Sequence, residues 1–402
     1  MADQIRQAGV VGLGVMGFDI AFLYAMKGYP TLAYDASAAA MAAIGERREQ
    51  TIERLKRRDR ISENEVENVR RGLVAASGPG DLARADLVTE AVFEAAEAKL
   101  AVYAGLKRCG FNGILTTNTS SLTRASLLAP AAYEAKRFAS THFFNPVLYT
   151  QMVEVVRGDM EEKSFRSMLA FLRSLGRAPA ETRDISGFVS NSILMYYAVM
   201  ALRLLEGGAP FEEIDQAAKE LRLPAPFVSL DSWKPRIVED VTRAMFRLRG
   251  DEFLRSSKLL GELARSNPKF YVEQRPNPEI YAKLKAAAER PGAAAIRRAL
   301  KISLLVAAAR VVELGEDPQT VDRIATDGLK MPQAPLREID GTGPEAVLEE
   351  LKRLNREMPD APLAPPELLA RMAREGESFY RGEEPNPRVA AFLRPKGSDA
   401  RH

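Results

Sequence analysis

The sequence predicts an α/β domain built on a doubly wound, mostly parallel sheet, followed by two all-helical domains. Over residues 1–185, short apolar strands alternate with helical segments, which is the pattern of parallel strands joined by crossover helices. A glycine-rich turn joins the first strand to the first helix. Beyond that region helical periodicity dominates, and the helical half contains an internal repeat, which predicts domains at residues 186–290 and 291–402.

In the first domain, each expected strand is a short run of apolar or β-branched residues bounded by turn residues. Because parallel strands end at one edge of a sheet, polar residues that follow these strands are candidates for a ligand site. Strands are expected at residues 8–11, 31–34, 87–92, 114–117, 138–141 and 152–156, and helices at 18–27 and within the basic segment 37–72.

Three glycines, Gly12, Gly14 and Gly17, form a Gly-x-Gly-x-x-Gly turn between the first strand and the first helix. In such a turn the first glycine permits the tight bend, the second lets a pyrophosphate approach the backbone, and the third allows close helix–strand packing. Asp35 ends the second strand, where a carboxylate would bind the adenosine ribose and repel a 2′-phosphate. The turn therefore predicts an NAD site, although Asp35 could also be a simple turn residue.

The helical half repeats its own pattern of residues, which indicates two similar helical domains. Its charged tail after Arg381 predicts mobile last residues. The corresponding positions are Asp215 and Asp322, Pro224 and Pro332, Asp231 and Asp340, and Phe270-Tyr271 and Phe379-Tyr380.

Composition excludes several classes of protein. The 402 residues suffice for two or three domains, and a net charge of +3 (57 basic against 54 acidic residues) argues against a dedicated nucleic-acid binder. One cysteine, Cys109, and two histidines exclude an internal disulfide and make a metal centre implausible. We found no signal peptide and no apolar stretch of the roughly 18 residues that span a bilayer, so a cytoplasmic protein without membrane insertion is expected.

The chain has one interior histidine, His142, which follows the expected strand 138–141; the other histidine is His402. Imidazole is the side chain that exchanges a proton near neutral pH, and oxidation of an alcohol by a nicotinamide cofactor needs such a base. Glu154 lies in the strand-like segment 152–156, and a nearby carboxylate would fix the tautomer of the ring. The two residues are a candidate catalytic pair, with two unrelated structural residues as the alternative.

Other polar residues have both a functional and a structural interpretation. Ser120 follows the strand 114–117 and could bind a ligand or cap the next helix. Asn145 could donate to a ligand or cap a turn, and Asn191 could reach a cleft or merely begin a helix. The basic run from Arg47 to Arg60 could be a solvated face or an anchor for substrate phosphates.

Together these motifs resemble the 3-hydroxyacyl-CoA dehydrogenase family of fatty-acid β-oxidation. The resemblance implies a stand-alone counterpart of the dehydrogenase half of the multifunctional β-oxidation enzymes. It implies a Rossmann-type NAD-binding domain followed by two helical domains of the family's C-terminal type. The matching elements are, in order, Gly12–Gly17, Glu90–Glu94 with Lys99, Asn118–Ser121, His142–Pro146, Val153–Val155 and Asp184–Asn191.

The resemblance also implies an activity: NAD-dependent oxidation of an (S)-3-hydroxyacyl-CoA to a 3-oxoacyl-CoA, with no metal. It makes His142 the base, oriented by Glu154, and makes Ser120 and Asn191 the residues that hold the substrate oxygen. The further contacts that it implies are Glu94, Lys99 and Asn145 with NAD, and Thr51 and Arg58 near the nucleotide of CoA.

The sequence departs from the family where Ser186 and Ser192 replace a usual proline and arginine. These departures keep two alternatives open: a dehydrogenase of the same fold that acts on a hydroxy acid without CoA, and a catalytically impaired NAD-binding homologue. A β-hydroxyacid dehydrogenase shares the glycine-rich start, but its lysine-bearing Gly-rich segment has no counterpart around Asn191.

The resemblance suggests partners as well as an activity. Single-repeat relatives pair through the helical domain, so a second repeat in the same chain could occupy the partner's place. We therefore expect a monomer or a loose homodimer that binds an acyl-CoA substrate, binds no nucleic acid, and could associate with other β-oxidation enzymes.

Overall fold

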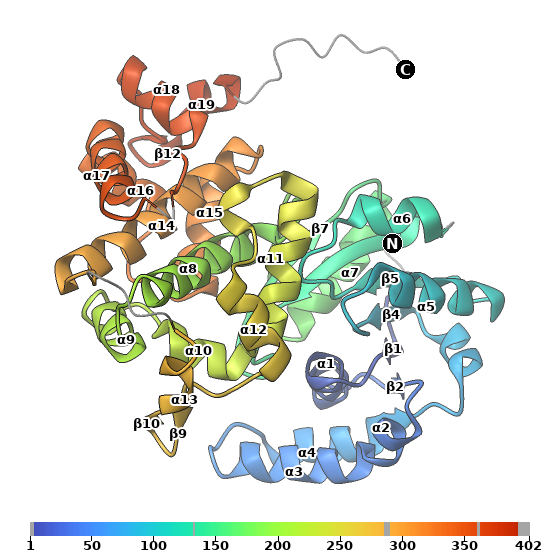
Figure 1. Cartoon of the computed structure of the whole chain (residues 1–402). Coiled ribbons are helices and arrows are strands. Elements are labelled where there is room, and N and C mark those ends of the chain that lie inside the picture. The colour runs from blue at the N-terminus through green and yellow to red at the C-terminus, as the bar shows by residue number, and fades with distance from the viewer. Residues whose placement is uncertain (1–3, 132, 285–289, 360–361, 393–402) are drawn as a thin grey trace. The chain divides into compact units, whose positions relative to one another are not determined.

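The computed structural model describes residues 4–131, 133–284, 290–359 and 362–392 (Figure 1). It divides the chain into two compact units, residues 1–184 and 185–402. Residues 393–402, which include His402 and the last residues of the tail predicted to be mobile, lie outside the described residues.

The first unit contains an eight-stranded sheet with the strand order β3-β2-β1-β4-β5-β6-β7-β8. Neighbouring strands are parallel except β6 and β7, which are antiparallel. The strands are β1 (Ala8–Val11), β2 (Thr31–Tyr34), β3 (Leu73–Ala75), β4 (Leu87–Glu90), β5 (Ile114–Thr117), β6 (Phe138–Phe143), β7 (Met152–Val156) and β8 (Ala178–Glu181). The helices are α1 (Val15–Met26), α2 (Ala38–Ala42), α3 (Ile44–Lys56), α4 (Glu63–Gly72), η1 (Pro79–Arg84), α5 (Ala96–Arg108), α6 (Arg124–Ala131), η2 (Ala135–Arg137) and α7 (Glu162–Ser174).

Helices cover both faces of this sheet, as the doubly wound prediction requires. Successive strand residues belong to two separate apolar clusters: Leu87 and Ile114 pack with α1 and α7, whereas Val88 and Leu115 pack with α5. This alternation follows from the two-residue period of a strand whose two faces are both buried. The predicted α/β fold of the first unit is therefore confirmed.

The predicted strand 138–141 was too short, because β6 continues through Phe143. Pairing with β7 extends it, since His142 lies opposite Glu154 and Phe143 lies opposite Val153. The prediction that His142 follows the strand is therefore wrong: it lies inside the strand, near its carboxyl end. The sequence also gave no signal for β3 and β8, which are short edge strands with several exposed residues.

The second unit is helical and shows the repeat directly. Each half begins with a long helix and ends with a two-stranded hairpin followed by a short helix. The first set is α8 (Phe188–Glu206), α9 (Phe211–Glu220), α10 (Pro226–Trp233), α11 (Pro235–Arg249), η3 (Glu252–Leu254), α12 (Lys258–Ser266), β9 (Tyr271–Val272), β10 (Arg275–Pro276) and α13 (Pro278–Tyr281). The second set is α14 (Ala293–Glu313), α15 (Pro318–Arg323), η4 (Ile324–Gly328), α16 (Pro335–Thr342), α17 (Pro344–Glu357), α18 (Glu367–Glu375), β11 (Tyr380–Arg381), β12 (Glu384–Pro385) and α19 (Pro387–Phe392).

The two sets pack against each other reciprocally. The long helices α8 and α14 lie side by side (Figure 1). Helix α14 also contacts α9 of the first set, and α8 contacts η4 of the second. Such exchange of equivalent contacts is the geometry of a two-fold interface between like partners. The division of this unit into separate domains at residues 186–290 and 291–402 stays a prediction.

Buried and half-buried aspartates at equivalent positions hold the two repeats in the same shape. In each repeat, one aspartate joins a helix start to the terminal hairpin and a second joins the body of that helix to the hairpin, through hydrogen bonds of 2.6–2.9 Å. Asp215 accepts from the backbone amide of Phe227 and from the Tyr271 hydroxyl, and Asp322 accepts in the same way from Leu336 and Tyr380. Asp231 accepts from the backbone amides of Phe270 and Tyr271, and Asp340 accepts from those of Phe379 and Tyr380.

Helix α8 is long and apolar enough to cross a membrane by length and composition alone. Within the fold, however, 83% of that stretch is buried. Neighbouring helices of the second unit, α14 above all, cover it. Its apolar character is therefore that of a core helix.

We expect the substitution Asp322→Ala to destabilise the second unit by about 2–4 kcal/mol, because it leaves buried donors without an acceptor. Asp327→Ala is the matched control, since Asp327 is exposed, and should change stability by less than about 0.5 kcal/mol. Thermal and urea unfolding would measure both variants. Equal stability of the two variants would contradict a structural role for the aspartate framework.

Candidate functional site

The glycine-rich turn lies at the carboxyl end of β1, and each glycine meets a different requirement. Gly12 has a φ of +91°, and a Cβ there would lie 2.6 Å from the amide nitrogen of Val92. A Cβ at Gly17 would lie 1.7 Å from the carbonyl oxygen of Gly12, whereas one at Gly14 would have no atom within 4 Å. The turn is therefore packed at its ends and open at its middle, which fits a backbone that a pyrophosphate approaches.

Asp35 follows β2 and faces this turn. Its carboxylate accepts hydrogen bonds from the amide of Leu13 at 2.6 Å and from the amide of Ser37 at 2.8 Å. The structure thus brings together Gly12, Gly14, Gly17 and Asp35, which the sequence had proposed as cofactor residues. The contact of Asp35 with a ribose stays a prediction.

A buried carboxylate that the sequence analysis did not assign a role organises the end of β4. Glu90 is fully buried, and it accepts from the Lys99 ammonium at 2.9 Å and from the backbone amide of Val92 at 2.8 Å. Its other oxygen accepts from the hydroxyls of Tyr103 and Thr117. A charged residue at the end of the strand Leu87–Glu90 is the signal that could have revealed it, since such groups are buried only when they are paired.

Glu94 links Lys99 to the loop that carries Ser120. It lies 3.2 Å from the Lys99 ammonium and accepts from the Thr119 hydroxyl and from the backbone amides of Ser120 and Ser121. Burial alone would raise the pKa of the Glu94 carboxyl, but Lys99 and these donors outweigh burial and lower that pKa. Burial would lower the pKa of Lys99, but the two glutamates outweigh it and raise that pKa.

Glu94 therefore contacts both Lys99 and the backbone of Ser120, two other residues that the sequence proposed for the site. The side chain of Lys99 is 0% exposed. Its contact with NAD, like that of Glu94, stays a prediction.

His142 and Glu154 form a direct hydrogen bond between β6 and β7. Nδ1 of His142 lies 2.8 Å from Oε2 of Glu154, and the two residues are register partners in the antiparallel pair. Partners that lie directly opposite in such a pair project from the same face of the sheet. Glu154 is fully buried, and His142 is 7% exposed. The hydrogen bond therefore fixes the orientation of the imidazole ring, with Nδ1 toward the carboxylate.

The loop after β5 is joined to the strand that carries the histidine. Oδ1 of Asn118 accepts from the backbone amide of Phe143 at 2.9 Å, next to His142. The backbone N–H of Asn118 in turn donates to the backbone carbonyl of Glu90 at the end of β4. The ends of β4, β5 and β6 are thereby fixed to one another along one edge of the sheet.

Three further proposed residues of the first unit are not among the hydrogen-bonded groups described above. Asn145 is exposed and precedes Pro146 through a cis peptide bond. Thr51 is buried in α3. Arg58 is exposed and donates to the Tyr149 hydroxyl at 3.2 Å. Roles for these three residues in ligand binding stay predictions.

Asn191 lies in the second unit, in the first turn of α8. Next to it, Ser186 and Ser192 share one arginine: Nη1 of Arg249, from the end of α11, donates to the Ser192 hydroxyl at 3.0 Å and to the Ser186 carbonyl at 3.3 Å. Helix α11 also packs its Met245 against Gly187. The two departures from the family therefore lie in a region that α11 stabilises.

The second repeat does not present an equivalent amide. Alignment of Glu206 with Glu313 places Arg298 opposite Asn191, since both lie 15 positions before the glutamate (206 − 191 and 313 − 298). Arg298 is paired with Glu357 at 2.9 Å. The second repeat thus keeps the fold but, where the first carries Asn191, it carries an arginine that pairs with an exposed glutamate.

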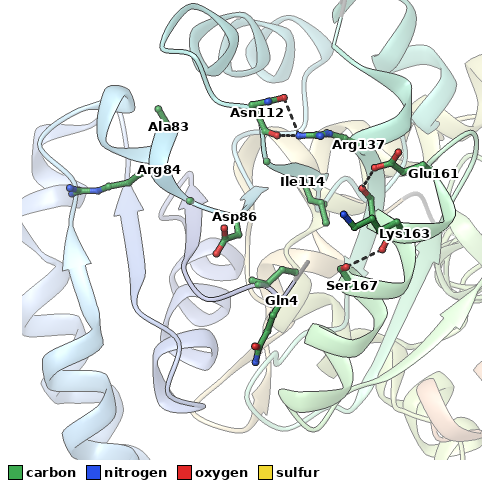
Figure 2. Close-up of a pocket in the computed structure, with 14 residues that line it drawn as sticks. Gln4, Ala83, Arg84, Asp86, Asn112, Ile114, Arg137, Glu161, Lys163 and Ser167 are labelled. Atoms are coloured by element: carbon green, nitrogen blue, oxygen red, sulfur yellow. Dashed lines mark hydrogen bonds between the residues drawn. The ribbon is translucent and has the colours of Figure 1, made fainter. Parts of the chain in front are cut away.

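Figure 2 shows a pocket at the opposite edge of the sheet, where β4 and β5 begin. Its polar groups bind one another: Arg137 donates to Oδ1 of Asn112 at 3.1 Å, and the Ser164 hydroxyl donates to Glu161 at 2.6 Å. We assign no function to it, because the carboxyl ends of the strands carry the site. No group of three or more His, Cys, Asp or Glu that could hold a metal ion was found in the part of the chain that the structure describes.

Two family models match this chain. Residues 7–185 match the model of the 3-hydroxyacyl-CoA dehydrogenase NAD-binding domain. Residues 187–269 and 296–383 each match the model of the 3-hydroxyacyl-CoA dehydrogenase C-terminal domain. The two C-terminal matches coincide with the two helical repeats.

Individual relatives agree with these models. The chain is 33% identical over 227 residues to the fatty acid oxidation complex subunit alpha of Pseudomonas syringae pv. syringae, a match that covers 56% of this chain and 31% of that subunit. The chain thus spans about a third of this curated relative's length.

Solved structures show the same fold. An (S)-3-hydroxybutyryl-CoA dehydrogenase from Ralstonia eutropha superposes with a TM-score of 0.60 at 29% identity, covering 65% of this chain and 94% of that one. The 3-hydroxybutyryl-CoA dehydrogenase of Escherichia coli superposes with a TM-score of 0.75 over 92% of this chain and 99% of that one, at 22% identity. The second comparison shows that the fold is shared over nearly the whole chain.

Two glycine substitutions should separate packing from cofactor binding. Gly17→Ala should cost about 3 kcal/mol or more of stability, because its Cβ would overlap the Gly12 carbonyl. Gly14→Ala should cost less than about 1 kcal/mol and still weaken NAD binding, because its Cβ would stand where the pyrophosphate approaches. Thermal unfolding and calorimetric titration with NAD measure the two effects; a stable Gly17→Ala variant would contradict the packing argument.

Replacing Lys99 by methionine tests the buried network. We expect a loss of about 3–5 kcal/mol in stability, because two buried carboxylates would lose their counter-charge. Lys107→Met, at an exposed position of the same helix, is the control and should unfold like the wild type. If Lys99→Met kept full stability and lost only NAD affinity, its role would be cofactor binding alone.

Proposed function

We propose that this chain, which belongs to the 3-hydroxyacyl-CoA dehydrogenase family and is an NAD-dependent dehydrogenase, oxidises (S)-3-hydroxyacyl-CoA to 3-oxoacyl-CoA in fatty-acid β-oxidation. The observation that carries the proposal is the hydrogen bond between His142 and Glu154 at 2.8 Å. A base held in one orientation near the carboxyl edge of a dinucleotide-binding sheet is what alcohol oxidation requires.

In this proposal, His142 acts as the general base. A carboxylate accepts hydrogen bonds and cannot donate them, so Glu154 selects the tautomer in which Nδ1 carries the hydrogen. In that tautomer Nε2 carries the lone pair, and in this proposal it takes the proton of the substrate's C3 hydroxyl. The ring becomes positively charged, and the carboxylate of Glu154, 2.8 Å from Nδ1, offsets that charge.

NAD, when bound, supplies the hydride acceptor for C3. The residues that would hold it are the glycine-rich turn Gly12, Gly14 and Gly17, with Asp35 at the ribose. Glu94, Lys99 and Asn145 would contact the nicotinamide side. Support comes from the open middle of the turn and from Glu94, which keeps partial exposure (21% of its side chain) despite its buried partners.

Substrate contacts follow the same logic. Ser120 and Asn191 would hold the C3 oxygen or the thioester carbonyl, because each carries a short polar side chain next to a fixed backbone segment. Thr51 and Arg58 would lie near the nucleotide of CoA. The pairing of Arg58 with Tyr149 shows that its guanidinium is already oriented without a phosphate.

A second candidate is a dehydrogenase of the same fold that acts on a hydroxy acid without CoA, and a third is a catalytically impaired NAD-binding homologue. Ser186 and Ser192, which depart from the family pattern beside Asn191, keep these candidates open. NADH formation with acyl-CoA substrates from C4 to C16 would favour the main proposal; activity only on free hydroxy acids, or NAD binding without turnover, would favour the others.

We further propose a monomer or a loose homodimer, since reciprocal contacts between the repeats already form an interface within the chain. Association with other β-oxidation enzymes is suggested by the relative that is a subunit of a fatty acid oxidation complex. A cytoplasmic location is part of the same proposal.

The catalytic pair is tested by two substitutions. His142→Gln should lower turnover by about 10²–10⁴-fold, since the base is lost, and should leave NAD affinity near that of the wild type. Glu154→Gln should lower turnover by at least about tenfold, because a neutral amide cannot offset the imidazolium charge. NADH absorbance with 3-hydroxyacyl-CoA measures turnover, and calorimetry measures NAD affinity.

Glu181→Gln is the matched control, because Glu181 is an exposed carboxylate on the adjacent strand β8. Its turnover should equal that of the wild type. Turnover of His142→Gln within a factor of three of the wild type would reject His142 as the base.

A further inference from the structure

Arg47 contacts the glycine-rich turn from helix α3. Its Nη1 donates to the carbonyl oxygen of Leu13, and its Nη2 donates to the carbonyl oxygen of Gly14 at 3.0 Å. Its guanidinium carbon lies 4.0 Å from the centre of the Phe18 ring, on the first turns of α1. One arginine thus spans the turn and the start of the helix that follows it.

These two hydrogen bonds fix the orientation of two peptide planes. In a planar trans peptide the carbonyl and the following N–H point in opposite directions. When the carbonyls of Leu13 and Gly14 face Arg47, the N–H groups of Gly14 and Val15 must face away from it. Both N–H groups lie at the start of α1, where no earlier helical turn supplies an acceptor.

A third peptide plane is fixed by Asp35, whose carboxylate accepts from the amide of Leu13 at 2.6 Å. Two side chains of opposite charge, Asp35 and Arg47, therefore hold successive peptides of the turn. The acid holds an N–H and the base holds two carbonyls. Without them the middle of the turn would be free to rotate, because Gly14 has the permissive backbone of glycine and open space around it.

The guanidinium is suited to this position. Burial lowers the pKa of Arg47, and the carboxylates of Asp19 and Asp35 partly restore it. Because arginine stays charged in proteins, the carbonyl side of the turn keeps a cation. A cation that binds the negative ends of these peptide dipoles stabilises the arrangement in which their positive ends point toward an anion.

We propose that Arg47 is a positioning residue of the cofactor site, which orients the Gly14 and Val15 amides toward the dinucleotide pyrophosphate without touching the cofactor. Its contribution should therefore appear with ligands that carry the pyrophosphate and disappear with a ligand that lacks it. Replacing a residue that merely supports the fold would weaken the binding of all ligands alike.

The experiment is calorimetric titration of the full chain with NAD, ADP and adenosine, with adenosine measured by competition against NAD where its heat is small. Arg47→Ala should weaken both NAD and ADP by about tenfold, the usual effect of losing hydrogen bonds to a charged group. Adenosine affinity should change by less than about twofold. Arg47→Lys keeps the charge but loses the bidentate hydrogen bonding of the guanidinium, so its loss of affinity for NAD and ADP should be intermediate.

Arg48→Ala is the matched control: within the described residues, the hydrogen bonds of this neighbouring arginine go to Glu49 at 3.0 Å and to the carbonyl of Arg70 at 3.4 Å rather than to the turn. It should bind all three ligands like the wild type. Unchanged ADP affinity in Arg47→Ala, or an equal loss for adenosine, would overturn the proposal. If the alanine variant fails to fold, the lysine variant decides by the same comparison of ADP with adenosine.

The inference rests on the assignment of the glycine-rich turn to NAD. The two can fail separately. A wild-type chain that does not bind NAD would remove the premise, whereas a wild-type chain that binds NAD, with an Arg47→Ala variant that binds it equally well, would reject Arg47 alone.

Discussion

The antiparallel pairing of β7 with β6 is the constraint on which the proposed chemistry depends. All other neighbouring strands of the eight-stranded sheet are parallel, and only here does the chain double back within a few residues. The register of this pair places His142 directly opposite Glu154, so a backbone ladder sets the distance between ring and carboxylate. A slip of one residue would send the two side chains to opposite faces of the sheet.

The rest of the edge is held by buried polar groups that bind one another. Glu90 and Glu94 share the ammonium of Lys99, and Glu94 also holds the loop that carries Ser120. Buried charges are costly unless they are paired and hydrogen-bonded. Here the paired charges hold loops that follow several different strands in a fixed shape. Charged side chains also fix the backbone of the glycine-rich turn, where Asp35 accepts from the amide of Leu13 and Arg47 donates to the carbonyls of Leu13 and Gly14.

Much of this could be predicted from the sequence, and the failures have physical reasons. The strand–turn–helix start and the helical repeats follow from local patterns that survive folding. The pairing of His142 with Glu154 was proposed from residue type and from the family resemblance, and the β6–β7 register brings the two side chains together. The end of β6 was misplaced because its last residues are extended by pairing with β7, a contact that no local pattern records. The roles of Glu90 and Arg47 were missed because each depends on partners brought together by the fold: Glu90 on Lys99 and Thr117, and Arg47 on the carbonyls of Leu13 and Gly14.

The central claim is that one imidazole, oriented by one carboxylate, takes the proton of the substrate alcohol. A crystal structure of the chain with NAD and acetoacetyl-CoA would test it most directly. The account predicts the C3 oxygen of the ligand within about 2.6–3.2 Å of Nε2 of His142, while Nδ1 remains bonded to Glu154. A C3 oxygen beyond the reach of His142, with another side chain or water network in its place, would contradict it.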